Sequence, residues 1–200
     1  MIGYVESNFV LEIALGQEGA ADARELLAAA QEGQIELAIP MFALCEPYAT
    51  VTNNAYGRRR TSEELDSQLR RAERNQENRD LAAAARQGWA AAAVTLDKQE
   101  MDSLEAVVAD LLQVATVLPL TAAIHAASIS FQAEHDLAPA DAVVYATVVD
   151  DLGQRTREEP KFFANRDGND FGTPAIRAQL RECNCELFVR FGAARGFLRR

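Results

Sequence analysis

Four acidic residues, far apart in the chain, have the types and positions of a shared carboxylate site: Glu6, Glu46, Asp141 and Asp167. Glu6, Glu46 and Asp167 each come just after a short apolar run that predicts a buried strand, and Asp141 opens a helix that leads to one. Carboxylates gathered in one place repel one another, which raises their pKa values unless cations neutralise them. Mg²⁺ and Mn²⁺ prefer such oxygen ligands, and ions held in this way can assist phosphodiester cleavage.

The elements that must position these acids alternate between strands and helices. Strands are predicted at residues 2–5, 35–39, 161–165 and 185–189, and a strand or an apolar connection at 117–120. This alternation predicts an α/β protein with three layers, α/β/α, around a central and mainly parallel sheet. Ligands of such sheets bind beyond the carboxyl ends of the strands. The four acids can therefore converge on one edge of the sheet.

The helix that carries Glu46 contains a proline, Pro47. Proline is tolerated in the first turn of a helix, whereas in the interior it costs about 3 kcal/mol. The helix is therefore predicted to start close to Ala43 or Leu44, which places Glu46 in its first turn.

The middle of the chain is helical and highly charged. Thr61 and Glu64 have the spacing of a capping box, which predicts that a separate, polar helix begins there and runs to about Arg86. A better patterned, core-facing helix is predicted from Asp97 to Ala115. We expect one domain over residues 1–200, with these helices as an elaboration around 58–116.

Charge is distributed unevenly along the chain. The formal net charge of −10 argues against a protein that binds nucleic acid through bulk electrostatics. Basic side chains are concentrated in two segments, 58–86 and 161–200. They either contact phosphates or form a solvated helix face.

The sequence contains no apolar run long enough to cross a bilayer and lacks the pattern of a signal peptide. The three cysteines are an odd number, and Cys183 and Cys185 are too close to bridge each other comfortably. We therefore expect free thiols, no membrane association and a cytoplasmic location. No cysteine and histidine spacing suits zinc, so a metal would have to bind oxygen.

Four segments, taken in order, resemble the four motifs of PIN-domain nucleases, a family that includes the toxin ribonucleases of toxin-antitoxin pairs. The segments are YVESNFVLE, IPMFALCEPYATV, APADAVVYATVVDD and FANRDGNDF. The resemblance extends from residue 2 to about 190 and is interrupted by the charged helical stretch 58–116. It implies a PIN-like fold and a metal-dependent endonuclease, usually one that cleaves RNA. It also raises an antitoxin-type protein partner and a homodimer as possible assemblies.

Residue by residue, the resemblance implies that Glu46, Asp141 and Asp167 are catalytic and bind Mg²⁺ or Mn²⁺, with Asp170 as a nearby candidate ligand. The first carboxylate of the site would be Glu6, positioned by hydrogen bonds from Ser7 and Asn8.

The chain departs from the family at its first motif, which usually begins with aspartate rather than with a glutamate such as Glu6. The longer side chain reaches farther but is held less firmly.

Two other interpretations remain at this stage. The chain can be a PIN-fold module with weakened catalysis that serves RNA binding or protein assembly. The glutamate at position 6 and the negative net charge favour this interpretation. Alternatively, the acids only cap helices, as Asp141 can do at a helix N-terminus, and the basic helix binds a protein partner.

Overall fold

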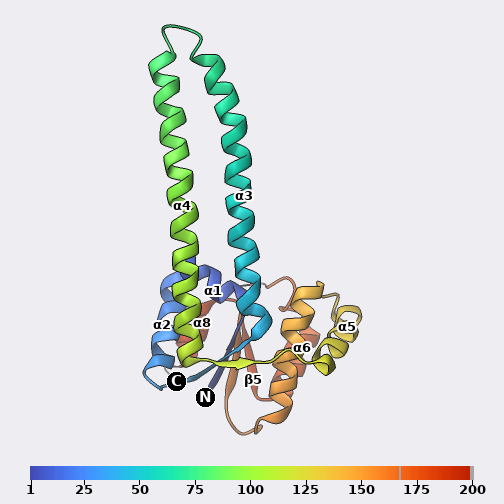
Figure 1. Ribbon diagram of the computed structural model, residues 1–200. Helices are drawn as coiled ribbons and strands as arrows, with labels where there is room; N and C mark the ends of the chain where they lie inside the picture. Colours follow the sequence, from blue (N-terminus) through green and yellow to red (C-terminus); the bar gives the residue numbers. More distant parts are fainter. Residues whose placement is uncertain (167, 199–200) are drawn as a thin grey trace. The chain divides into compact units, whose positions relative to one another are not determined.

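The computed structural model describes residues 1–166 and 168–198, and its centre is one five-stranded parallel sheet (Figure 1). The strands are β1 (Ile2–Val5), β2 (Glu36–Pro40), β3 (Thr116–Leu118), β4 (Lys161–Ala164) and β5 (Cys185–Phe188). Their order in the sheet is β3-β2-β1-β4-β5, and every neighbouring pair is parallel. The predicted α/β class and parallel sheet are confirmed.

The two strands at the middle of the sheet are buried along their whole length. Every residue of β1 and of β4 is buried. In the sequence, a strand that is covered on both faces appears as a nearly continuous apolar run rather than as an alternating pattern. This is why the segments IGYV and KFFA identify strands directly in the sequence.

The helices that belong with the sheet lie on both of its sides. They are α1 (Ser7–Ala14), α2 (Ala20–Gln31), α5 (Ala122–His135), α6 (Pro139–Gln154), α7 (Pro174–Glu182) and α8 (Phe191–Phe197). Figure 1 shows α1, α2 and α8 on one side of the sheet and α5 and α6 on the other. The arrangement is compatible with the three layers expected from the sequence.

Contacts divide the chain into two compact units. One contains Met1–Pro47 and Leu104–Arg200, and the other is Tyr48–Ser103. The second unit consists of parts of two long helices, α3 (Met41–Ala72) and α4 (Arg79–Val114), and overlaps the elaboration expected around 58–116.

The second unit, which we call the hairpin, is held together by ionic and hydrogen-bonded contacts between its helices. The guanidinium of Arg58 donates to Oδ1 of Asp97 at 2.6 Å and to both carboxylate oxygens of Glu100 at 2.8 Å. The indole N–H of Trp89 donates to Oγ of Ser62 at 2.7 Å. At least one arginine of the basic segment 58–86 is therefore committed to internal pairing.

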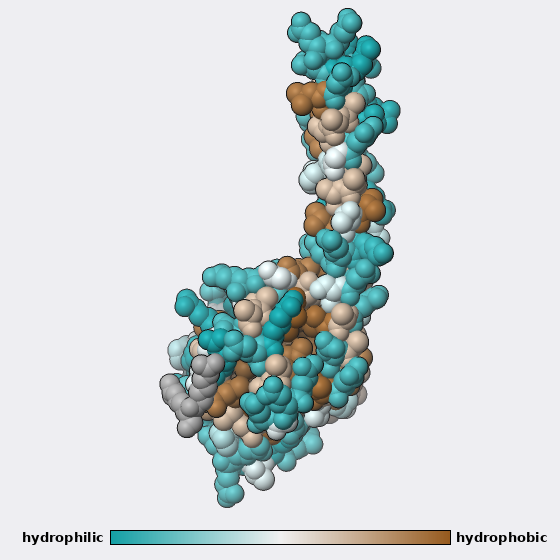
Figure 2. Space-filling model, turned by 90° about the vertical axis from the view of Figure 1, so that its left-hand side faces the viewer, coloured by the Kyte–Doolittle hydropathy of each residue, from teal (hydrophilic) through white to brown (hydrophobic). Residues whose placement is uncertain are grey.

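Hydrophobic side chains also reach the surface of the hairpin (Figure 2). The large ones that are exposed include Tyr56, Leu81, Val94 and Leu96. Two helices alone can bury only a thin apolar stripe between them, so part of the apolar surface stays in solvent.

Three predicted helix starts are wrong, and so is the predicted place of Glu46 in a first turn. The helix α4 begins at Arg79, so Asp97 lies in its interior, and Glu46 is the sixth residue of α3. The helix α3 begins at Met41 rather than near Ala43 or Leu44, and Pro47 lies inside it. The helix then continues through Thr61, where the capping box predicted a new start, and ends at Ala72. Contacts made by α3 with α4, such as those of Arg58, offset the preference of about 1 kcal/mol for a new helix start at Thr61.

Among the described helices, none is both long and apolar enough to span a membrane.

Close packing between β1 and β4 gives a test of the core. A Cβ atom added to Gly3 would lie 2.2 Å from Cζ of Phe162, which is fully buried. We expect Gly3→Ala to lower the free energy of unfolding by about 3 kcal/mol, because overpacking forces side chains and backbone to shift. The measurement is urea denaturation. Gly153→Ala is the matched control, because a Cβ atom there has no neighbour within 4 Å. Equal stability of the two variants would contradict this packing.

Candidate functional site

The strand order places a switch point between β1 and β4. From β1 the chain adds β2 and then β3 on one side, and it returns to add β4 and β5 on the other. Open α/β sheets bind ligands at such a point, beyond the carboxyl ends of the strands. Val5 and Ala164 are register partners at the ends of the two strands. The residues that follow them, Glu6 and Asn165, therefore flank the switch point.

Glu6 is a buried carboxylate at the start of a helix. It is the N-cap of α1 and is only 3% exposed. Its Oε2 accepts hydrogen bonds from the backbone N–H of Asn8 at 2.9 Å and from the hydroxyl of Ser7 at 3.0 Å. The hydrogen bonds expected from Ser7 and Asn8 are present. The other oxygen, Oε1, is buried and has no hydrogen-bond partner among the described residues.

Ser7 links Glu6 to Glu46. The Ser7 hydroxyl oxygen also lies 2.6 Å from Oε2 of Glu46, so one hydroxyl bridges the two carboxylates. A single hydroxyl proton serves one acceptor at a time. Residues 39 positions apart are thereby brought to one place. The link joins the first and second sequence motifs.

Burial and charge raise the pKa of Glu6 to about 7. Desolvation is the largest cause, because a buried carboxyl loses the hydration of its charged form. The neighbouring charge of Glu46 raises the pKa further, whereas the hydrogen bonds from Asn8 and Ser7 lower it. A cation beside the two carboxylates would relieve both the desolvation and the repulsion.

Two of the other acids predicted for the site, Asp141 and Asp170, also lie among the described residues. Asp141 lies in the first turn of α6, whose other end leads to β4, and it is half-buried. Asp170 is half-buried in the turn after β4. Asp167 lies outside the described residues. Within residues 1–166 and 168–198, no three His, Cys, Asp or Glu side chains form a group that could hold a metal ion. Glu6 and Glu46 are joined directly, through the hydroxyl of Ser7.

Asn165 is a candidate site residue that the sequence analysis missed. The sequence predicts a strand over 161–165, which includes Asn165, whereas β4 ends at Ala164 and Asn165 follows it. Its side chain is fully buried, and neither Nδ2 nor Oδ1 has a partner in the described part of the chain. Unpaired buried amides are rare, because each lost hydrogen bond costs about 1–3 kcal/mol. A polar residue that ends a central strand is the signal that could have identified it.

The residues at the switch point fit a divalent cation that binds oxygen. Glu6 Oε1 and Asn165 Oδ1 are buried oxygens without hydrogen-bond partners among the described residues, and Glu46 adds a second carboxylate. Carboxylate and amide oxygens are the ligands that Mg²⁺ and Mn²⁺ prefer. Unsatisfied buried oxygens often mark the place of an ion or a water.

Comparison of the sequence with models of known protein families gives no match, and comparison with curated proteins gives none either.

Proposed function

We propose that this chain is a PIN-like, Mg²⁺- or Mn²⁺-dependent endoribonuclease that hydrolyses RNA phosphodiester bonds at the carboxyl edge of its sheet. The observation that carries the proposal is the pair formed by the buried Glu6 and the half-buried Glu46, joined by Ser7 at the switch point. The four motifs that resemble the family support it. The proposal includes a PIN-like fold and a cytoplasmic location.

In this proposal, Glu6 and Glu46 hold the cation, with Asn165 as an additional oxygen ligand and with Asp141 and Asp167 assigned from the resemblance. An ion bound by these residues would supply Lewis-acid stabilisation of the charge that develops on the phosphodiester. Ser7 joins the two carboxylates, and the burial of Glu6 keeps bulk water away from its side chain. An excluded-water site strengthens every electrostatic contact made in it.

The test is a cleavage assay with labelled structured RNAs in Mn²⁺, Mg²⁺ and EDTA, together with the Asp141→Asn variant. We expect cleavage in either metal, and its loss both in EDTA and in the variant. Cleavage that persists in EDTA would contradict the proposal. The variant should keep the thermal unfolding temperature of the wild type, because Asp141 is only half-buried.

A second candidate function is a PIN-fold module with weakened catalysis, which binds RNA or assembles with a protein such as an antitoxin or a second copy of the chain. The presence of Glu6 where the family usually has aspartate favours it. Glu6→Asp separates the two functions. Metal-dependent cleavage that is absent in the wild type and appears in Glu6→Asp would establish the weakened module.

A further inference from the structure

A polar cavity of about 660 Å³ lies within the sheet-containing unit, at the carboxyl edge of the sheet. Three arginines from separate segments line it, namely Arg166 after β4, Arg190 after β5 and Arg195 within α8. We call these three residues the arginine groove. Two carboxylates, those of Glu18 and Asp22, line the cavity as well. Carboxylates balance part of the positive charge, so what favours an anionic ligand here is the number of guanidinium N–H donors that line one cavity.

Arg166 is fixed by a buried carboxylate. Its Nη1 pairs with Oε1 of Glu12, whose side chain is 2% exposed. The other oxygen of Glu12 accepts the backbone N–H of Gly19 at 2.6 Å, so the acid itself is held on both sides. Its Nη2 also lies 3.7 Å from Oε2 of Glu18, an exposed carboxylate. A guanidinium has five N–H donors, so these two pairings leave some of them for a ligand. Because Arg166 is already positioned, it loses less conformational entropy when a ligand binds.

The other two arginines differ in their pairing. Arg195 donates to Oε1 of Glu25 at 2.8 Å and forms an ion pair with Oδ1 of Asp22 at 2.9 Å, which orients it while it remains half-buried. Arg190 is exposed and makes no ion pair with any residue that the structure describes. The groove thus combines two arginines that are held in place by carboxylates with one, Arg190, that has no ion pair among the described residues.

The geometry points to the phosphodiester backbone of an RNA strand as the ligand of the arginine groove, an inference that rests on the proposed function. Planar guanidinium groups match phosphate oxygens in bidentate pairs. Several arginines along one cavity suit repeated phosphates better than a single anion. Arg166 directly follows Asn165, so the groove begins beside the switch point. A strand cleaved at Glu6 and Glu46 would continue along Arg166 toward Arg190 and Arg195.

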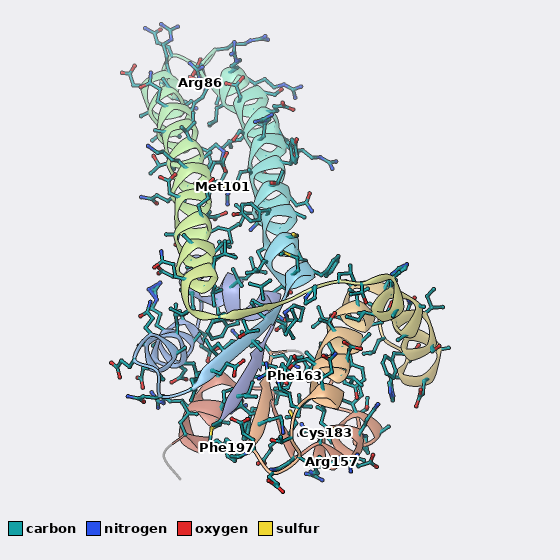
Figure 3. All side chains as sticks on the ribbon, turned by 60° about the horizontal axis from the view of Figure 1, so that its bottom comes forward. Arg86, Met101, Arg157, Phe163, Cys183 and Phe197 are labelled. Carbon is teal, nitrogen blue, oxygen red and sulfur yellow. The ribbon has the colours of Figure 1, made fainter. Side chains whose placement is uncertain are left out.

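The experiment measures binding without cleavage. The parent protein carries Glu46→Gln, and fluorescence anisotropy with a short, labelled single-stranded RNA is recorded in EDTA over a range of salt concentrations. Arg190→Gln and Arg195→Gln are added separately to this parent. Arg157→Gln is the matched control, because Arg157 is also exposed and precedes β4, at the opposite edge of the sheet. Figure 3 shows it beside Cys183, which precedes β5.

We expect each groove variant to weaken RNA binding by about tenfold, the usual effect of removing a charged hydrogen bond. The slope of log Kd against log salt should also fall by about 0.7 for each phosphate that the variant no longer neutralises. Arg157→Gln should change neither quantity. Because Arg195 also pairs with Asp22 and Glu25, the thermal unfolding temperature of its variant is measured in parallel, and Arg190→Gln gives the result that is free of this effect.

The binding and cleavage experiments distinguish an error in the assignment of the arginine groove from an error in the proposed function. If the groove variants bind RNA as the Arg157 control does, or if the parent binds no RNA at low salt, the groove is not an RNA site, whatever the cleavage assay shows. If the groove variants lose binding but the wild type cleaves RNA with no metal, the groove is supported and the nuclease proposal fails.

Discussion

Replacing Glu46 by glutamine is expected to lower metal-dependent RNA cleavage by about a hundredfold or more. Glutamine has nearly the same size as glutamate and can still accept the hydrogen bond from Ser7, so the packing is preserved. It lacks the negative charge that a divalent cation requires beside Glu6. The measurement is the single-turnover cleavage rate in Mn²⁺ with the enzyme in excess over the RNA.

Glu186→Gln is the matched control for this variant. Glu186 lies in β5 and is exposed, so the same change of charge occurs away from the switch point. The control should cleave RNA at the rate of the wild type. If Glu46→Gln also does so, Glu46 is not a ligand, and the pair joined by Ser7 has only a structural role.

A second large effect is expected on the pH dependence of stability, because folding raises the pKa of Glu6 from 4.5 to about 7. Below pH 4.5 Glu6 is protonated in both the folded and the unfolded chain and has no differential effect. As the pH rises toward 7, the unfolded chain releases this proton while the folded protein retains it, so the free energy of unfolding falls. At about 1.4 kcal/mol per pKa unit, the difference corresponds to about 3 kcal/mol of stability lost above pH 7.

Urea denaturation of the wild type and of Glu6→Gln at several pH values isolates this contribution. Other groups titrate over the same range in both proteins. The informative quantity is therefore the difference between the two proteins in their free energy of unfolding at each pH. We expect Glu6→Gln to gain stability relative to the wild type between about pH 4.5 and pH 7. A constant difference over this range would show that Glu6 is not held in a desolvated state.

The same urea denaturation, repeated with Mn²⁺ present, tests whether Glu6 binds a metal. Above pH 7, where Glu6 is ionised in the folded protein, Mn²⁺ should stabilise the wild type by about 2.7 kcal/mol at a hundred times its Kd. The stabilisation should weaken below pH 7, because a proton then competes with the metal for Glu6. Mn²⁺ should stabilise the Glu6→Gln variant much less than the wild type. Equal stabilisation of both proteins would place the bound metal elsewhere.

The positions of the strands could be predicted from the sequence because buried parallel strands are short and mostly apolar. The runs at 2–5, 161–165 and 185–189 correspond closely to β1, β4 and β5. The ends of the long helices were predicted less well. A capping box at Thr61 is a preference of about 1 kcal/mol, which contacts between α3 and α4 override in the folded chain.

The sequence by itself determined the α/β alternation and the presence of acids after three of the predicted strands, because both depend on local patterns of residue type. Only the tertiary structure decided the strand order, and with it the switch point between β1 and β4. It also decided that Ser7 bridges Glu6 and Glu46 and that Asn165 is buried at the same switch point without a partner among the described residues. These features depend on which segments become neighbours across the sheet, and neighbours far apart in the chain leave no periodic signal in the sequence.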